Sequence, residues 1–189
     1  MDTFSAYMKS KTPLTEREIA HIRSAATPMR IKRKELFLRQ GEVCPGYAFV
    51  LDGCFRVYRP GSDGTEHIIR FSIENWWLCD MESIDLQQPA KNAIEALETS
   101  DILFWTTQDF HHLFSQLPAF EALIYQLRSR NHYFSQQRIF TALSYSPEEK
   151  YRDFLTSYPD IANRVPLHMI ASYLGVTRKT ITRVRAVHR

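Results

Sequence analysis

The segment Met169-Ile-Ala-Ser-Tyr-Leu-Gly-Val-Thr-Arg-Lys-Thr-Ile-Thr-Arg-Val-Arg185 predicts two short helices joined by a sharp turn. Ile170 and Leu174 lie four residues apart, so they share one face of the first helix. Gly175 can adopt the left-handed conformation that ends a helix abruptly. The first half of the segment therefore reads as a helix followed by a tight turn.

The second half of the segment continues this pattern. Thr177 is a suitable N-cap, and Ile181 with Val184, three residues apart, supplies the buried face of a second helix. Such a helix-turn-helix exposes long donors and short hydroxyls, which are the groups that contact base edges and phosphates in DNA. The predicted DNA-contacting residues are Thr177, Arg178, Lys179, Thr180, Thr182, Arg183 and Arg185.

The charge distribution agrees with a nucleic-acid-binding end. Residues 161–189 contain six Lys or Arg and no Asp or Glu, although the whole chain has 24 basic and 21 acidic residues and a net charge of +3. The first 160 residues are therefore mildly acidic. A basic module on an acidic body suits docking onto a polyanion. A plainer interpretation of the charge alone is a solvated basic helix at a chain end.

Composition limits the remaining possibilities. The chain has 189 residues, of which 44% are hydrophobic and 13% aromatic, enough for one large domain or a medium and a small one. No apolar window is long enough to span a membrane, and residues 1–11 lack the apolar core of a secretion signal, so we expect a cytoplasmic protein without a membrane partner. Cys44, Cys54 and Cys79 are scattered, which predicts reduced, packed thiols.

The first half of the chain predicts a β-rich domain. A capping box at Thr15–Glu18 opens a helix that runs to about Ala26, and the sequence then changes to short apolar or alternating runs. A strong hairpin turn lies at Gly61–Gly64. This spacing predicts a sandwich or barrel with strands near residues 35–38, 47–51, 54–58, 66–71, 93–97 and 102–105.

A long helix is predicted beyond Pro118. A short helix capped near Thr107 precedes it, and its own periodic segment lasts to about Leu143, interrupted by Asn131. Such a helix would pack on its own body and also pair with a copy; the alternative is an ordinary long core helix. A further helix starts at Ser146, and Pro159 and Pro166 bracket the linker to the terminal motif.

Specific motifs accompany this order of elements. They are Arg39–Glu42, Gly46–Gly53 and the Gly61–Glu66 hairpin in the first half of the chain, and Arg164–Thr177 near its end. Together they resemble the Crp/Fnr family of bacterial transcription regulators, in which the first group looks like the first half of the β-roll and the last looks like the start of the DNA-binding motif. The resemblance implies an α+β fold, with an antiparallel β-roll of jelly-roll type, flanking helices, a long dimerisation helix and a C-terminal helix-turn-helix. The implied domains are a sensor β-roll at 1–117, a linking helix at 118–145 and a DNA-binding domain at 146–189.

The resemblance also implies a ligand site, in which a Gly-Glu pair and a later Arg-Ser pair hold a cyclic nucleotide. Here these pairs appear as Cys79-Asp80 and Lys91-Asn92, and Lys cannot reproduce the bidentate fork of Arg. We therefore expect no binding of cyclic AMP. A pocket for an unidentified small-molecule effector would include Cys79, Asp80, Met81, Lys91, Asn92 and Ala93. Trp76, Trp77, Met81 and Tyr47 would either line such a pocket or belong to the core.

Other cofactors and enzymatic functions are not favoured. Three scattered cysteines do not suit an iron–sulfur cluster, and His67 is the main histidine candidate in the roll for a haem ligand. A cupin-type metalloenzyme would need several converging His residues, whereas His111 and His112 lie on the following helix. We expect no cofactor and no catalytic residues.

The DNA-reading residues depart from the family in one respect. The family often has Arg-Glu-x-x-x-Arg on its recognition helix, where this chain has Arg178-Lys179 followed by Arg183. Because Lys cannot accept a hydrogen bond, the preferred DNA sequence should differ from the family's commonest one. The sequence given also ends at Arg189, which predicts a motif without a full β-hairpin wing.

The sequence thus predicts a homodimeric transcription regulator that binds a pseudo-palindromic site in double-stranded DNA. RNA polymerase and a small-molecule effector are further candidate partners. The alternative functions are a sensing or interaction module that does not bind DNA, and the cupin-type metalloenzyme.

Overall fold

The computed structural model describes residues 2–187 of the chain. These residues form two compact units. The first contains the residues up to Pro60 together with Ile69–Leu127, and the second contains Gly61–Ile68 together with the residues from Arg128 onward.

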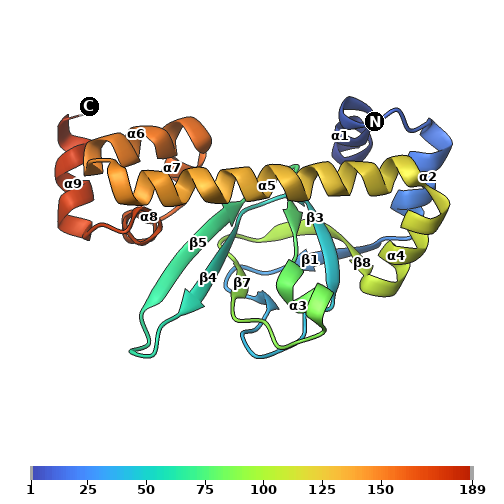
Figure 1. Cartoon of the computed structure of the whole chain (residues 1–189), viewed down its shortest axis with the longest axis horizontal. Helices are drawn as coiled ribbons and strands as arrows, with labels where there is room; N and C mark the ends of the chain where they lie inside the picture. Colours follow the sequence, from blue (N-terminus) through green and yellow to red (C-terminus); the bar gives the residue numbers. More distant parts are fainter. Residues whose placement is uncertain (1, 188–189) are drawn as a thin grey trace. The chain divides into compact units, whose positions relative to one another are not determined.

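The elements follow one another as the sequence predicts, helices at both ends and strands between them (Figure 1). Before the long helix come α1 (Thr3–Lys11), α2 (Glu16–Ser24), β1 (Thr27–Ile31), β2 (Leu36–Leu38), β3 (Gly46–Asp52), β4 (Phe55–Pro60), β5 (Glu66–Ser72), β6 (Trp77–Leu78), α3 (Met81–Leu86), β7 (Ala93–Ala96), β8 (Ser100–Thr106) and α4 (Thr107–Gln116). The long helix and its successors are α5 (Pro118–Ser144), α6 (Pro147–Ser157), α7 (Ile161–Arg164), α8 (Leu167–Leu174) and α9 (Arg178–Val187).

The strands form two four-stranded sheets, with the orders β1-β8-β3-β6 and β2-β7-β4-β5. In the first sheet β3 pairs antiparallel with β8, so that Phe49 lies opposite Leu103. In the second, β4 pairs antiparallel with β7, and Arg56 lies opposite Glu95. The six predicted strand regions are all strands, and the predicted α+β fold with antiparallel sheets is confirmed.

An aromatic cluster forms the centre of the first unit. Trp105 on β8 is fully buried and packs against Trp77, with ring centroids 5.4 Å apart, and against Phe110 of α4 at 6.0 Å. Phe4 of α1 lies 5.1 Å from Phe49 of β3 in an edge-to-face arrangement. The cluster therefore joins α1 and α4 to the first sheet through buried aromatic surface.

Side-chain caps fix the starts of the helices. Thr15 and Glu18 form the predicted capping box of α2, and Ser146 forms a second capping box at the start of α6. At α4 the cap is Thr106 rather than the predicted Thr107, because the Thr106 hydroxyl accepts the Asp109 amide at 3.1 Å. Each cap satisfies an amide that has no partner within its helix.

Some elements were not predicted from the sequence. Strand β1 is exposed at four of its five residues, so it lacks an alternating pattern, and β6 is only two residues long. Helix α7 forms a single turn in what was predicted as a linker. Helix α1 was also missed, although Asp2 caps it. None of the helices in the described part of the chain is long and apolar enough to cross a membrane.

Gly53, between β3 and β4, is predicted to be intolerant of substitution. Its φ is +115°, and a Cβ there would lie 2.1 Å from the Oγ and 2.8 Å from the Cα of buried Ser100. At Gly41 φ is +88°, but no atom lies within 4 Å of the added Cβ. We expect Gly41→Ala to lower the free energy of unfolding by about 1–2 kcal/mol, from backbone strain alone. Gly53→Ala should cost about 1–3 kcal/mol more because of overpacking.

Urea unfolding followed by circular dichroism measures both values. Equal losses of stability in the two variants would contradict the steric argument.

Candidate functional site

The turn between α8 and α9 has the geometry that the sequence predicts. Gly175 follows α8 with φ +65° and ψ +35°, in the left-handed region. The Gly175 amide donates to the Ser172 carbonyl oxygen at 3.2 Å, and the Val176 amide donates to the Ala171 oxygen at 3.0 Å. These bonds satisfy the last carbonyls of α8 and turn the chain sharply into α9.

The predicted apolar positions hold the two helices together. Ile170 and Leu174 on α8 and Ile181 and Val184 on α9 are all buried, as the spacing predicts. Phe154 of α6 is also buried. The opposite side of α9 is consequently left exposed.

That exposed side carries the predicted cations. Arg178, Lys179 and Arg183 are exposed, and Arg185 is partly buried. Arg183 lies 4.0 Å from the Glu148 carboxylate of α6, a contact between two largely exposed side chains that contributes little stability. The described residues of α9 include no acidic side chain. The helix thus presents donors to solvent with no carboxylate of its own to neutralise them.

The threonines of the motif are partly used within the helix. The Thr177 hydroxyl accepts the Thr180 amide at 3.1 Å, and the two hydroxyl oxygens lie 2.8 Å apart. The Thr182 hydroxyl donates to the Arg178 carbonyl oxygen at 2.9 Å. These hydroxyls form hydrogen bonds within the start of α9. The side chains of Arg178, Lys179 and Arg183 are exposed and can therefore donate to a ligand.

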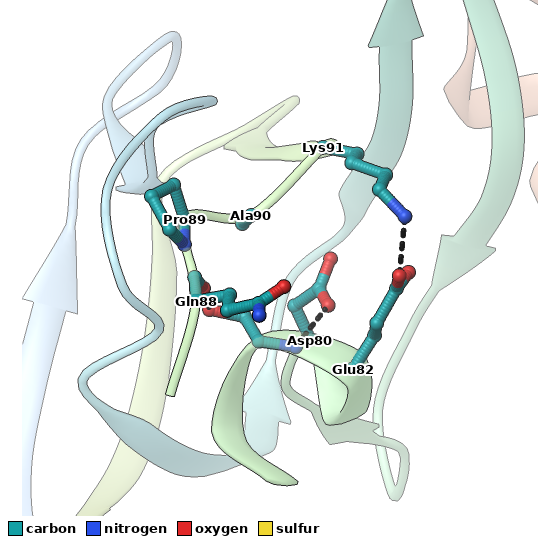
Figure 2. Close-up of a pocket in the computed structure, with 7 residues that line it drawn as sticks. Asp80, Glu82, Gln88, Pro89, Ala90 and Lys91 are labelled. Carbon is teal, nitrogen blue, oxygen red and sulfur yellow. Dashed lines mark hydrogen bonds and ion pairs between the residues drawn. The ribbon is translucent and has the colours of Figure 1, made fainter. Parts of the chain in front are cut away.

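A small hollow lies beside α3 in the first unit, where the resemblance places a ligand (Figure 2). Its volume is about 10 Å³, room for about one water molecule. It contains two of the predicted pocket residues, Asp80 and Lys91. The other lining residues are Glu82, Ser83, Gln88, Pro89 and Ala90.

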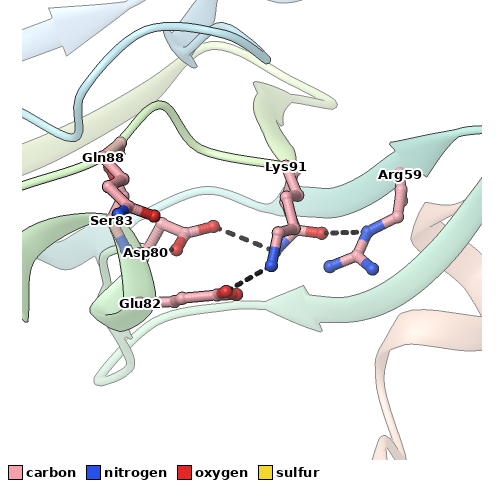
Figure 3. A network of polar contacts seen from close by, with 7 residues as sticks. Arg59, Asp80, Glu82, Ser83, Gln88 and Lys91 are labelled. Atoms are coloured by element: carbon pink, nitrogen blue, oxygen red, sulfur yellow. Dashed lines mark hydrogen bonds and ion pairs between the residues drawn. The ribbon is translucent and has the colours of Figure 1, made fainter. Parts of the chain in front are cut away.

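The polar groups around this hollow already pair with one another (Figure 3). Lys91 forms an ion pair with Glu82, and the hydrogen bond from Lys91 lowers the pKa of the Glu82 carboxyl. Asn92 donates to the Asp80 carboxylate at 2.9 Å and accepts from Arg59 Nε at 3.0 Å. An anionic ligand would have to displace Glu82 and approach Asp80, an arrangement that repels negative charge.

Three of the other predicted pocket residues, Cys79, Met81 and Ala93, do not line the hollow. Cys79 and Met81 pack against the hydrophobic core, with their sulfur atoms 3.2 Å apart, and Ala93 is buried in β7. Tyr47 stacks on Phe110 at 3.9 Å, and Trp77 belongs to the aromatic cluster, so neither lines the hollow.

The sequence did not predict that Glu82 and Ser83 line the hollow. It also did not predict that Arg59 donates a hydrogen bond to Asn92. Glu82 and Ser83 follow a possible cap, Asp80, and this was the one local sign that they share its surroundings. Nothing local signals that Arg59 is bonded to Asn92, 33 positions away.

Among residues 2–187, no group of three or more His, Cys, Asp or Glu side chains is placed to hold a metal ion. His67 is exposed on β5, and His111 and His112 are exposed on α4.

Nearly all strand residues of the first unit lie in a segment that matches a known family model. Residues 28–117 match the family model of the cyclic nucleotide-binding domain. The match covers a little under half of the chain. Within it, the hollow beside α3 is small, and Lys91 there already pairs with Glu82.

Solved structures resemble the chain beyond that domain. FixK2 from Bradyrhizobium japonicum has a TM-score of 0.75, is 17% identical, and the match covers 86% of this chain and 83% of that one. CLP, a c-di-GMP responsive global regulator from Xanthomonas campestris, has a TM-score of 0.75 at 12% identity, with 92% and 91% covered.

The catabolite activator protein from Thermus thermophilus has a TM-score of 0.61 at 17% identity, with 93% of this chain and 84% of that one covered. These likenesses confirm the predicted resemblance to Crp/Fnr regulators at the level of fold. No curated protein sequence matches the chain.

Cyclic AMP should leave the thermal stability of the protein unchanged. A nucleotide bound with a Kd of about 10 μM would add about 2.7 kcal/mol at 1 mM ligand and raise Tm by several degrees. We expect no such shift in Tm, because Lys91 already forms an ion pair with Glu82 and the Asp80 carboxylate adds a second negative charge to the hollow. Differential scanning fluorimetry measures the shift, and 5′-AMP at the same concentration is the control. A saturating rise in Tm with cyclic AMP alone would contradict the expectation.

Proposed function

We propose that the chain is a non-enzymatic, sequence-specific DNA-binding transcription regulator of Crp/Fnr type that acts as a homodimer in the cytoplasm. The observation that carries the proposal is the exposed basic side of α9. Arg178, Lys179 and Arg183 are exposed there, and no acidic residue occurs anywhere in residues 161–189. Long donors on a short helix after a tight turn suit the major groove, where Arg and Lys bind guanine O6 and N7.

A protein-binding role for the same motif does not explain the absence of acidic residues. A surface that binds other proteins has no reason to exclude Asp and Glu, whereas a surface that binds phosphates does. The fold neighbours support the same choice, because one is named a catabolite activator protein and another a global regulator. RNA polymerase remains a candidate partner if the protein activates transcription.

The proposed dimer rests on the surface of α5. All seven residues from 131 to 137 are exposed, so the described residues leave much of the surface of this part of α5 open to solvent. Large apolar side chains occur on the exposed surface of the helix; they are Tyr125, Tyr133, Phe134, Ile139, Phe140 and Leu143. Leu143 is 83% exposed. Apolar surface of this kind along a helix favours pairing with a second helix.

A second copy is the occupant that suits the proposed DNA target. A two-fold dimer presents two recognition helices to two half-sites about 34 Å apart. The predicted boundaries of the domains, 1–117, 118–145 and 146–189, remain part of this proposal.

Loss of two cations from α9 should abolish specific DNA binding. The operator is first obtained by selecting genomic fragments with the wild-type protein. Arg178→Ala/Arg183→Ala should then lower the affinity roughly 100-fold or more, because each base or phosphate contact contributes about 1–3 kcal/mol. Fluorescence anisotropy at several salt concentrations measures the affinity and its salt dependence.

The matched control is Lys32→Ala/Arg33→Ala, which removes the same charge from exposed positions in the first unit. We expect it to change the affinity by less than about threefold. Equal losses in the two double variants would indicate general attraction to a polyanion and contradict sequence-specific reading by α9.

Charges on the exposed apolar surface of α5 should separate the dimer. Phe140→Glu/Leu143→Glu should raise the dimer dissociation constant roughly 100-fold or more, because buried apolar anchors dominate such interfaces. Sedimentation velocity over a range of concentrations measures the constant. Val43→Glu/Leu86→Glu, which alters exposed apolar residues outside α5, should leave it unchanged. A wild-type chain that sediments as a monomer at high micromolar concentration would overturn the dimer.

A further inference from the structure

The tip of the β4–β5 hairpin belongs to the same compact unit as the C-terminal helices. This unit joins Gly61–Ile68 to the residues from Arg128 onward. The proposed function gives the hairpin tip no role, yet several polar contacts connect it to α8 and α5. These contacts suggest that the hairpin tip supports the helix-turn-helix.

The hairpin tip forms several hydrogen bonds of its own. The Asp63 carboxylate accepts the Thr65 amide at 2.9 Å and the Thr65 hydroxyl at 2.8 Å. The Gly61 amide donates to the Thr65 carbonyl oxygen at 2.7 Å, and Gly64 adopts a φ of +80°. A tip held in this way can act as a support, because it does not need to be ordered by its partner.

The Ser172 side chain of α8 forms two hydrogen bonds with the backbone of this tip, one as donor and one as acceptor. Its hydroxyl donates to the Glu66 carbonyl oxygen at 2.9 Å and accepts the Ile68 amide at 3.1 Å. The side chain therefore pairs with an amide and a carbonyl at alternate positions of β5. It lies three residues before Gly175, the pivot of the turn into α9.

Arg138 of α5 adds a second link at the same place. One of its guanidinium nitrogens, Nη2, donates to the carbonyl oxygens of both Ile68 and Tyr173, each at 3.0 Å. The guanidinium also stacks over the Tyr173 ring at 4.1 Å from its centroid. Tyr173 in turn packs against Phe154 of α6 at 5.4 Å. A single cation thus ties the hairpin to the last turn of α8.

We propose that Ser172 and Arg138 are positioning residues, which fix α8 on the hairpin tip and thereby set the orientation of α9 for DNA. The inference rests on the proposed function, since it concerns how the recognition helix is held. Both side chains satisfy backbone groups of β5 and so depend on the hairpin being in place. Direct contact with DNA is not required of either residue.

The test compares Ser172→Ala with Ser172→Thr, which keeps the hydroxyl, in the full-length protein. Ser157→Ala, at an exposed serine near the end of α6, is the matched control. Two quantities are measured: the exchange rate of the Ile68 amide proton by NMR without DNA, and the affinity for the selected operator as a function of salt. Arg138→Gln provides a second variant that removes the other link.

We expect Ser172→Ala to speed exchange of the Ile68 amide about tenfold, as loss of one hydrogen bond would. Operator affinity should fall roughly five- to tenfold. The salt slope of Arg138→Gln should equal that of the wild type, because no contact between a cation and a phosphate is removed. Arg138→Gln should lower affinity in the same range by loss of two hydrogen bonds. Ser172→Thr and Ser157→Ala should resemble the wild type in both measurements.

Several results would overturn the inference. Unchanged exchange of the Ile68 amide in Ser172→Ala would show that the link does not form in solution. Faster exchange with unchanged operator affinity would show that the link does not position α9. A reduced salt slope in Arg138→Gln would assign Arg138 to direct phosphate contact instead. If the wild type selects no operator, the proposed function itself fails, and this inference fails with it.

Discussion

The burial of Trp105 is the constraint on which the β-roll depends. This side chain is fully buried, and its indole nitrogen donates to the Ile22 carbonyl oxygen of α2 at 2.8 Å. Because a buried N–H without a partner is costly, the position of α2 is tied to that of β8. The same ring contacts Trp77 and Phe110, so the first sheet and α4 assemble around it. The start of α5 follows, since Phe120 packs on Phe110 at 5.2 Å.

Features fixed by neighbouring residues were the ones that the sequence predicted well. The capping box at Thr15, the helix start at Ser146 and the left-handed turn at Gly175 each depend on a few adjacent residues, and all three form as expected. Strand β1 could not be recognised in this way. Its residues are mostly exposed, and it exists because Thr27–Ile31 pairs with β8, about 70 positions later in the chain. Pairing over such a distance leaves no periodic signal in the strand itself.

The two candidate sites, the exposed side of α9 and the hollow beside α3, also differed in how well the sequence predicted them. The exposed cations of α9 follow from helical spacing around Ile181 and Val184, so the sequence was enough to place them. The hollow beside α3 depends instead on which charges meet across loops. Lys91, predicted to belong to an effector pocket, forms an ion pair with Glu82. Sequence reasoning found the altered residues but not that their charges neutralise one another.

The exposure of residues 131–137 has a consequence for folding as well as for association. An isolated helix shorter than about 12–15 residues is only marginally stable in water, and most helices are held by packing of one face. All seven residues are exposed among the described residues, so packing contributes little to the helical order of these two turns of α5. In the proposed dimer, a second molecule would supply that packing, and helix formation in the middle of α5 would then depend on protein concentration.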